Sequence, residues 1–151
     1  MKQTERTKCL AAFQRYIRVS KANPSGYVKC ITCGKYFPWD KVDAGHYIQR
    51  SCRATEMEPD NVWPQCKMCN RFKAGDHATY RLNLLLLIGE ERVERLEAIH
   101  ALYMGADLYK DRLTKEDQLK AISRKSKGEY KQLASLLRKN TRELLQQKGL
   151  L

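Results

Sequence analysis

At residues 30 to 51 the chain reads CITCGKYFPWDKVDAGHYIQRS, and at residues 65 to 77 it reads QCKMCNRFKAGDH. Each stretch contains a CxxC pair, Cys30 with Cys33 and Cys66 with Cys69, and 32 residues separate the two pairs. In a reducing compartment this spacing favours one tetrahedral tetrathiolate zinc site over two disulfides. Four thiolates leave no open position on zinc, so we expect the ion to be structural.

The length and the apolar content of the chain limit the class of protein. A chain of 151 residues with 42% apolar content suits one compact domain with arms or tails. The longest apolar run, LLLLI at 84–88, is far shorter than the roughly 20 residues of a membrane span. The first residues lack an apolar block of secretory type, so we expect a cytoplasmic chain. Cys9 and Cys52 have no partner at ligand spacing, and we expect free thiols there.

The positive charge of the chain is concentrated at its two ends. The formal charge is +12, from 29 lysines and arginines and 17 acids. Residues 1–29 carry 7 basic and 1 acidic side chains, residues 30–109 carry 10 and 11, and residues 110–151 carry 12 and 5. A near-neutral centre between basic ends indicates a polyanionic partner, with DNA as the first choice, gripped at the periphery.

The pattern of residues predicts an α+β fold. We expect a helix over 10–21, short strands and a knuckle turn over 27–49, and a helix that begins at the second CxxC pair and ends at Gly75. Asp76 is placed to cap a helix over 77–88, and a regular apolar stripe predicts another over 90–103. The run TKED at 114–117 predicts a start for a long basic helix over 115–139, interrupted or weakened near Gly128.

The order of these parts suggests a site for phosphodiester hydrolysis. A zinc pair, a hairpin bearing His46, a loop bearing Asn61, and a zinc pair opening a helix with Asn70 form a ββα-metal arrangement. Hydrolysis requires a base, a cation against the developing charge, and rigid placement of both. His46 is the candidate base. The amide of Asn61 can orient its ring directly or through the backbone, and Asn70 can offer an oxygen to magnesium or manganese.

These motifs resemble those of the HNH, or His-Me finger, nucleases, with His46, Asn61 and Asn70 at the motif positions. More narrowly, GYVKCITCGK, DAGHYIQRS, DNVWPQCKMCNRFKAGD and IGEERVERLE resemble the NinG, or Rap, family of phage recombination endonucleases. The similarity runs from about residue 13 to 96, with a weaker echo in the basic tail. The resemblance implies a phage-encoded endonuclease, acting in an infected or prophage-bearing cell on branched DNA such as Holliday junctions and D-loops.

The chain departs from the HNH pattern at one metal position. Many HNH members carry an aspartate just before the histidine, whereas this chain has Gly45. Asp43 is the nearest carboxylate and a candidate metal ligand; on a regular strand it would face away from His46, whereas a bulge at AGH would bring it round. Asp76 and His77 are the alternative ligands for magnesium. Candidate phosphate contacts lie on the second zinc segment and the preceding loop: Lys67, Arg71, Lys73, Arg50 and Arg53.

We therefore expect three parts: a basic helical arm over 1–26, a zinc-bound nuclease core over 27–109, and a basic helical tail over 110–151. Truncation after residue 109 should then weaken DNA binding and leave the catalytic fold intact. A homodimer would suit paired cuts across a junction, and the segment 76–103 is the candidate surface. Phage or host recombination proteins are further possible partners. Two alternatives remain: a non-catalytic zinc-stabilised DNA-binding module, and an HNH nuclease of another pathway.

Overall fold

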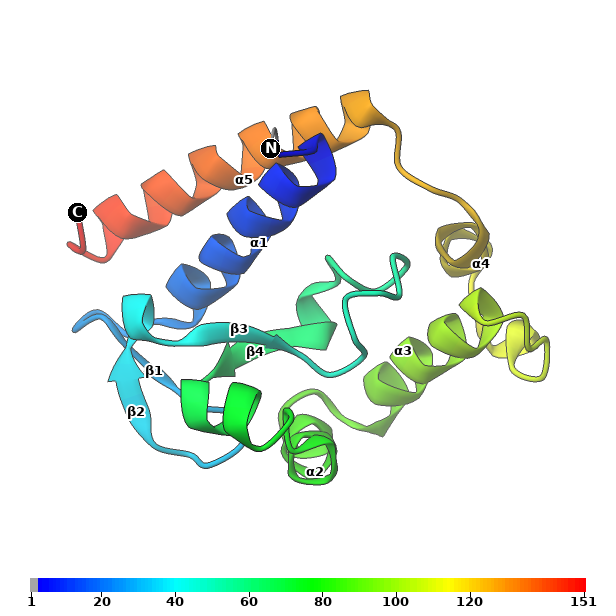
Figure 1. The fold of residues 1–151 in the computed structure, drawn as a ribbon, viewed down its shortest axis with the longest axis horizontal. Helices are drawn as coiled ribbons and strands as arrows, with labels where there is room; N and C mark the ends of the chain where they lie inside the picture. The colour runs from blue at the N-terminus through cyan, green and yellow to red at the C-terminus, as the bar shows by residue number, and fades with distance from the viewer. Residues whose placement is uncertain (1–2) are drawn as a thin grey trace.

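The computed structural model describes residues 3–151 and has an α+β architecture (Figure 1). The long helices are α1 (Glu5–Lys21), α2 (His77–Ile88), α3 (Glu90–Tyr103), α4 (Lys115–Ile122) and α5 (Lys127–Gln147). The strands are β1 (Tyr27–Lys29), β2 (Tyr36–Pro38), β3 (Asp43–His46) and β4 (Val62–Gln65). Four short helical turns are η1 (Trp39–Lys41), η2 (Pro59–Asn61), η3 (Met68–Phe72) and η4 (Lys110–Arg112).

Two small antiparallel sheets form the centre of the molecule. In the first, β1 pairs with β2, with Val28 opposite Phe37. In the second, β3 pairs with β4, with Gly45 opposite Trp63 and His46 opposite Val62. The turn between β1 and β2 carries the first cysteine pair, and the chain leaves β4 directly into the second pair. The predicted order of strands, knuckle and following helical turn is therefore present.

Helix α1 packs against the β3–β4 sheet, and α5 lies along α1 (Figure 1). Thr4 caps α1 by accepting a hydrogen bond from the backbone N–H of Thr7. Both helices run in the same direction, because Arg6 lies near Tyr130 at their beginnings and Lys148 reaches the end of α1. Their facing side chains form one apolar cluster with the sheet, which contains Cys9, Phe13, Ile17, Ala44, Val62, Tyr130, Ala134 and Leu137.

This packing argues against the expectation that the tail can be removed without loss of the catalytic fold. Leu137 of α5 is 6% exposed and Phe13 of α1 is 3% exposed, within the cluster that also buries Val62 of β4. The side-chain ammonium of Lys148 donates to the last carbonyls of α1, at 2.9 Å from Val19 and 2.6 Å from Ala22. The segment after residue 109 is thus part of the hydrophobic core.

The helix predicted over 115–139 is interrupted, as expected, close to Gly128, and two helices occupy this region. α4 ends at Ile122, and α5 begins after Ser126, whose hydroxyl accepts from the backbone N–H of Glu129. The Glu129 carboxylate in turn accepts from the backbone N–H of Ser126, which completes a capping box. Gly128 lies inside the first turn of α5, just after the break.

Helices α2 and α3 pack together below and beside the sheets (Figure 1). Tyr80, Leu84, Leu96 and Ile99 are fully buried between them and the central loop. The apolar run at 84–88 divides between two environments: Leu84 is in the core, whereas Leu86 is 85% exposed. Core packing therefore explains only one side of α2. Within residues 3–151, no helix is long and apolar enough to cross a membrane.

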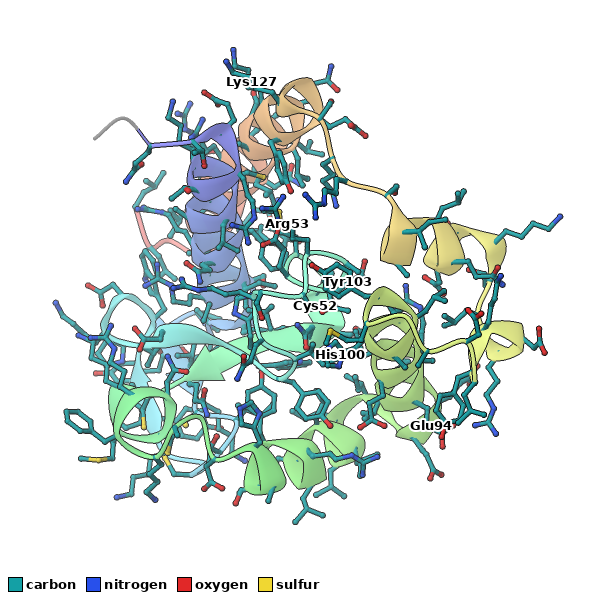
Figure 2. All side chains as sticks on the ribbon, turned by 45° about the vertical axis from the view of Figure 1, so that its right-hand side comes forward. Cys52, Arg53, Glu94, His100, Tyr103 and Lys127 are labelled. Carbon is teal, nitrogen blue, oxygen red and sulfur yellow. The ribbon has the colours of Figure 1, made fainter. Side chains whose placement is uncertain are left out.

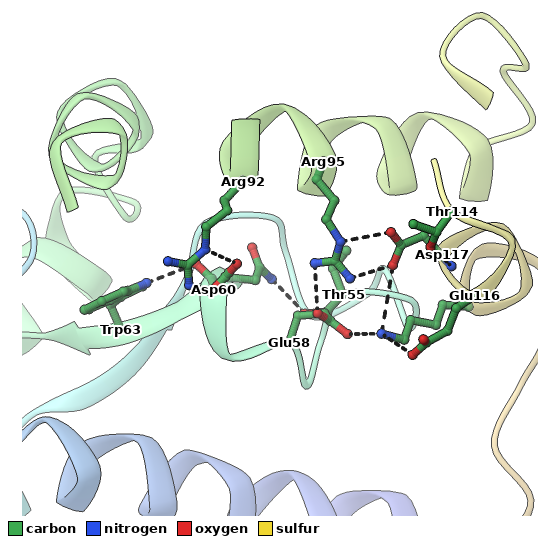
Figure 3. A network of polar contacts seen from close by, with 11 residues as sticks. Thr55, Glu58, Asp60, Trp63, Arg92, Arg95, Thr114, Glu116 and Asp117 are labelled. Atoms are coloured by element: carbon green, nitrogen blue, oxygen red, sulfur yellow. Dashed lines mark hydrogen bonds and ion pairs between the residues drawn. The ribbon is translucent and has the colours of Figure 1, made fainter. Parts of the chain in front are cut away.

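A network of ion pairs ties α3 and α4 to the turn before β4 (Figure 3). Arg95 of α3 contacts Glu58 at 3.3 Å and Asp117 of α4 at 2.5 Å. Lys120 of α4 also reaches Glu58, at 3.2 Å, and Arg92 forms two hydrogen bonds with Asp60. Because Glu58 and Asp60 flank the turn that carries Asn61, the network fixes the position of that turn.

Candidate functional site

The four cysteines of the two CxxC pairs converge on one point. Their sulfur atoms all lie within 4.8 Å of one another, and the Cys33 and Cys66 sulfurs are 3.9 Å apart. Sulfurs arranged tetrahedrally at about 2.3 Å from a zinc ion would be roughly 3.8 Å apart. Within residues 3–151 this is the only such group of three or more cysteine, histidine or carboxylate side chains. The four cysteines can therefore hold zinc.

Backbone and side-chain contacts around the cysteines support ligation. Burial would raise the pKa of the Cys30 thiol, but backbone N–H groups, including that of Cys66 at 3.3 Å, lower it below its ordinary value. The side-chain amide of Asn83 in α2 donates to the carbonyl of Ile31 at 2.7 Å. The knuckle is thus oriented by the helix that follows the second pair.

A cleft of about 810 Å³ lies beside the zinc cluster, between α1, β3 and the turn that follows η3. His46 and Asp43 from β3 both line it, as do Asn70 and His77. Arg50 and Arg71 line it as well, with Gln14 and Arg18 of α1. Asp43 and His46 therefore line the same cleft, although β3 pairs with β4 in a continuous register without the bulge considered above.

His46 is fixed by a hydrogen bond to the backbone. Its Nε2 lies 2.8 Å from the carbonyl oxygen of Glu56. A carbonyl only accepts, so Nε2 carries the proton and Nδ1 is left as the basic nitrogen. Burial lowers the pKa of His46 below its ordinary value of 6.5, while the Glu56 carbonyl acts in the opposite direction. The imidazole is therefore neutral near pH 7.

Glu56 itself is held from both outer helices. Its side chain is 1% exposed and forms an ion pair with Arg6 of α1, with N–O distances of 2.5 and 3.2 Å. The hydroxyl of Tyr130 in α5 donates to the same carboxylate at 3.4 Å. Because a buried carboxylate is stable only with such partners, the loop that presents the Glu56 carbonyl to His46 depends on α1 and α5.

Asn61 acts through the backbone and does not contact the ring of His46. It is fully buried, and its Oδ1 accepts from the backbone N–H of Ile48 at 2.7 Å. Its Nδ2 donates to the carbonyls of Ile48 and Thr55, at 2.9 and 3.0 Å. The side chain thereby joins the segment after His46 to the segment before Glu56. The sequence left open whether Asn61 orients His46 directly or through the backbone, and the structure shows contact through the backbone.

Asp43 and Asn70 are in direct contact. Nδ2 of Asn70 donates to a carboxylate oxygen of Asp43 at 3.0 Å, and Arg71 binds both oxygens at 2.9 Å. Burial would raise the pKa of Asp43, but the hydrogen bonds from Arg71 and Asn70 outweigh it and lower the pKa. The carboxylate and the amide oxygen of Asn70 are both hard oxygen donors, which fit magnesium or manganese.

Close packing explains why glycine precedes His46. A Cβ at Gly45 would lie 2.2 Å from Oε1 of Gln65, which is fully buried in β4. Nε2 of Gln65 donates to the hydroxyl of Thr32 and to the carbonyl of Gly75. The hydroxyl of Tyr80 donates to the Gly45 carbonyl at 2.8 Å. The space that an aspartate side chain would need at position 45 is thus filled.

The other predicted site residues do not line the cleft. Asp76 occupies the N-cap position of α2 in a left-handed conformation, but its side chain makes no capping hydrogen bond, and it does not line the cleft. Lys67 and Lys73 are exposed outside the cleft. Arg53 lies on the loop between β3 and β4, beside Cys52 and close to Tyr103 of α3 (Figure 2). Cys9 and Cys52 are buried free thiols.

Four residues with roles in the site gave no signal in the sequence. Glu56, Gln65 and Tyr80 support His46 or its strand, and Arg6 supports Glu56. Glu56, Tyr80 and Arg6 lie outside the quoted motifs, and Gln65 lies inside one without being a candidate ligand or base. A buried polar residue is recognised by its partners, and these partners come from distant parts of the chain.

Fold and site together define a small α+β protein with a four-cysteine metal cluster beside a polar cleft. Residues 2–139 match the family described as "NinG: Bacteriophage Lambda NinG protein", and the chain belongs to this family. "Protein ninG" of Escherichia phage lambda is 37% identical over 79 residues, and that of Salmonella phage P22 is 36% identical over 75 residues. Each match covers 47% of this chain and 35% of the relative. No solved structure is significantly similar to it.

Proposed function

We propose that the protein is a metal-dependent DNA endonuclease of the HNH, or His-Me finger, type. One observation carries the proposal: the proton on Nε2 of His46 is fixed by the Glu56 carbonyl, and the ring lines the same cleft as the Asp43–Asn70 pair. A neutral base and a pair of oxygen donors in one polar cleft are what phosphodiester hydrolysis requires. The β3–β4 pair followed by η3 supports the ββα-metal interpretation.

His46 is the general base in this mechanism. Its Nδ1 accepts a proton from the attacking water, and the hydrogen bond from Nε2 to the Glu56 carbonyl stabilises the imidazolium that forms. Asn61 holds the Glu56 carbonyl at a fixed position relative to the end of β3, because its side chain forms hydrogen bonds with both Ile48 and Thr55. Arg50, which lines the cleft and is exposed, is placed to neutralise a phosphate.

Asp43 and Asn70 would hold a magnesium or manganese ion. When bound, the ion supplies positive charge against the phosphate and the leaving oxygen. Arg71 now binds both oxygens of Asp43, and its side chain is 59% exposed, so it is free to turn toward a phosphate. His77 lines the cleft, but imidazole is a poorer ligand for magnesium than oxygen. Asp43 and Asn70 are therefore the preferred pair.

The substrate proposed is branched DNA, such as Holliday junctions or D-loops. Support comes from the positive charge of the two ends and from the resemblance of the motifs to phage recombination endonucleases. The zinc-loaded protein should cut an end-labelled four-way junction in the presence of magnesium. It should not cut the junction when magnesium is chelated, and it should not cut a matched linear duplex. A protein that binds the junction but never cuts it, with magnesium or with manganese, would instead be a zinc-stabilised DNA-binding module.

A further inference from the structure

A second groove lies between α1 and α5, separate from the cleft. Its volume is about 510 Å³, and four cationic side chains line it: Lys8 and Arg15 from α1, and Arg138 and Arg142 from α5. No aspartate or glutamate side chain lines it. The groove is therefore a concentrated positive surface formed by two helices that are far apart in the sequence.

The cations of the groove are largely available for a ligand. Arg138 and Arg142 are exposed, lie one turn apart, and take part in no ion pair within residues 3–151. Lys8 has a neighbouring partner, Glu5, at 3.1 Å. Arg15 has no carboxylate partner in that same part of the chain, and its guanidinium lies 5.4 Å from the centre of the Trp39 ring.

Helix α1 connects the groove to the cleft. Gln14 and Arg18 line the cleft, whereas Lys8 and Arg15 line the groove. At 100° per residue these two faces of the helix are roughly a quarter-turn apart. Arg18 also lies over Trp39, at 5.9 Å, so Arg15 and Arg18 share one aromatic ring. The positive surface thus continues around the helix without a neutral gap.

The two arginines on Trp39 are a repulsive pair. Burial lowers the pKa of Arg18, and the charge of Arg15 lowers it further, against the opposing effects of Asp43 and Asp40. Like charges held this close are stabilised by an anion placed over both of them. A chain of phosphates that crosses α1 would supply one.

We propose that the α1–α5 groove is a second phosphate-backbone site, which holds one arm of a branched DNA while another arm lies in the cleft. The inference rests on the proposed nuclease function. Lys8 and Arg15 are two turns apart, so the positive charge extends about 10 Å along the groove, which suits a polymer of phosphates better than one small anion. A linear duplex would occupy the cleft alone, whereas a branched DNA engages both surfaces.

The test compares Arg138→Gln/Arg142→Gln with Lys115→Gln/Arg124→Gln, which removes two exposed charges that line neither surface. Binding of a fluorescent four-way junction and of a short linear duplex is measured at several salt concentrations with chelator. The groove variant should bind the junction about tenfold more weakly, with a salt slope shallower by about 2. Its affinity for the duplex should change less than twofold, and the control variant should match the wild type on both DNAs.

Arg138→Lys/Arg142→Lys should restore most of the affinity, since the charge is kept. Equal losses in the groove and control variants would overturn the inference, because they would reflect net charge only. Unchanged junction binding by the groove variant would also overturn it, and would leave an acidic protein segment as the ligand of the groove. If the wild-type protein binds neither DNA, the proposed nuclease function fails together with the inference.

Discussion

The Nε2 atom of His46 lies 2.8 Å from the carbonyl oxygen of Glu56, while the carboxylate of Glu56 is bound by Arg6 and Tyr130. One residue therefore joins the candidate base to both outer helices. Its backbone sets the tautomer of the imidazole, and its side chain sets the position of that backbone. Substitutions of the base, of the residues that support it and of the zinc cysteines should consequently differ in their effects on cleavage rate, stability and zinc content.

Replacing His46 with alanine should abolish cleavage and preserve the fold. The side chain is neutral, so its loss uncovers no charge, and cleavage should fall by roughly 10²- to 10⁴-fold, the usual contribution of a positioned base. Single-turnover cleavage of a labelled junction measures the rate, and zinc content and junction affinity report on the fold. His100→Ala, on α3 away from the cleft, is the matched control and should cut normally.

Asn70→Ala should also lose activity, but for a different reason. It removes a proposed oxygen ligand that contacts Asp43, so a high concentration of magnesium or manganese should restore part of the rate. No metal concentration should rescue His46→Ala. Wild-type cutting by a folded His46→Ala protein would refute the mechanism, and loss of zinc or of folding would assign His46 a structural role.

The rate of cleavage should stay high below neutral pH. Burial lowers the pKa of His46 below 6.5, so the neutral base persists as the pH falls through 6.5, and the rate should decline only below the lowered pKa. The unfolded chain binds a proton at His46 more readily than the folded chain does. Folding stability should therefore decrease as the pH falls below 6.5, and it should level off below the lowered pKa.

Rate profiles and thermal unfolding between pH 5 and 8 test both statements. The His46→Ala protein should lose less stability over this range than the wild type. A rate that falls at a pH above 6.5 would show that another group, or a charged imidazole, controls the reaction.

Removing one cysteine of the zinc cluster should destabilise the whole site. Cys66→Ser leaves three thiolates and breaks the link between the knuckle and the strand that pairs with β3. We expect less than one zinc per chain, a lower thermal midpoint and loss of cleavage. Cys52→Ser, which removes a buried thiol outside the cluster, should keep one zinc per chain. A fully active Cys66→Ser protein would contradict a structural zinc.

Removing Arg6 should weaken the fold by leaving the Glu56 carboxylate buried without its main partner. Arg6→Gln should cost about 3–5 kcal/mol, the usual effect of breaking a buried ion pair. Denaturant unfolding measures this cost, and Arg15→Gln is the exposed arginine control on the same helix. A change below 1 kcal/mol would show that Tyr130 and the backbone hold the loop without the ion pair.

Truncation after residue 109 should yield an unstable protein, not a soluble catalytic core. The deletion would expose the side of α1 that α5 covers, and it would remove Tyr130, Ala134 and Leu137 from the cluster that contains Phe13 and Val62. In the full chain, Leu137→Ala should cost about 2–5 kcal/mol because Leu137 is 6% exposed in this cluster. A well-folded truncated protein that still cuts DNA would show that α1 and the sheet are stable alone.

The sequence predicted the features that depend on local spacing. The cysteine cluster follows from two CxxC pairs, and α2 and α3 follow from apolar periodicity bounded by Gly89. TKED correctly predicted the start of α4, where the Thr114 hydroxyl accepts from the backbone N–H of Asp117. The break before α5 is also encoded locally, by the capping box of Ser126 and Glu129, two residues before the glycine that indicated it.

The support of His46 could not be predicted, because it comes from residues distant in the sequence. Tyr130 lies 74 residues from Glu56, and Gln65 blocks a side chain at Gly45 only because β3 and β4 pair in one register. Whether Asp43 shares a cleft with His46 could not be decided from the sequence, for a related reason. Alternation along an ideal strand does not describe a four-residue strand whose ends form a cleft wall.

The pairing of α1 with α5 also sets a sequence of events during synthesis. α1 precedes α5 in the chain, and its final carbonyls wait for Lys148, which is made 129 residues after Val19. Until Tyr130 and Leu137 have emerged, the nascent chain exposes the apolar side of α1, and the Glu56 loop lacks one of its two partners. The loop that supports His46 can therefore reach its final position only after α5 has left the ribosome.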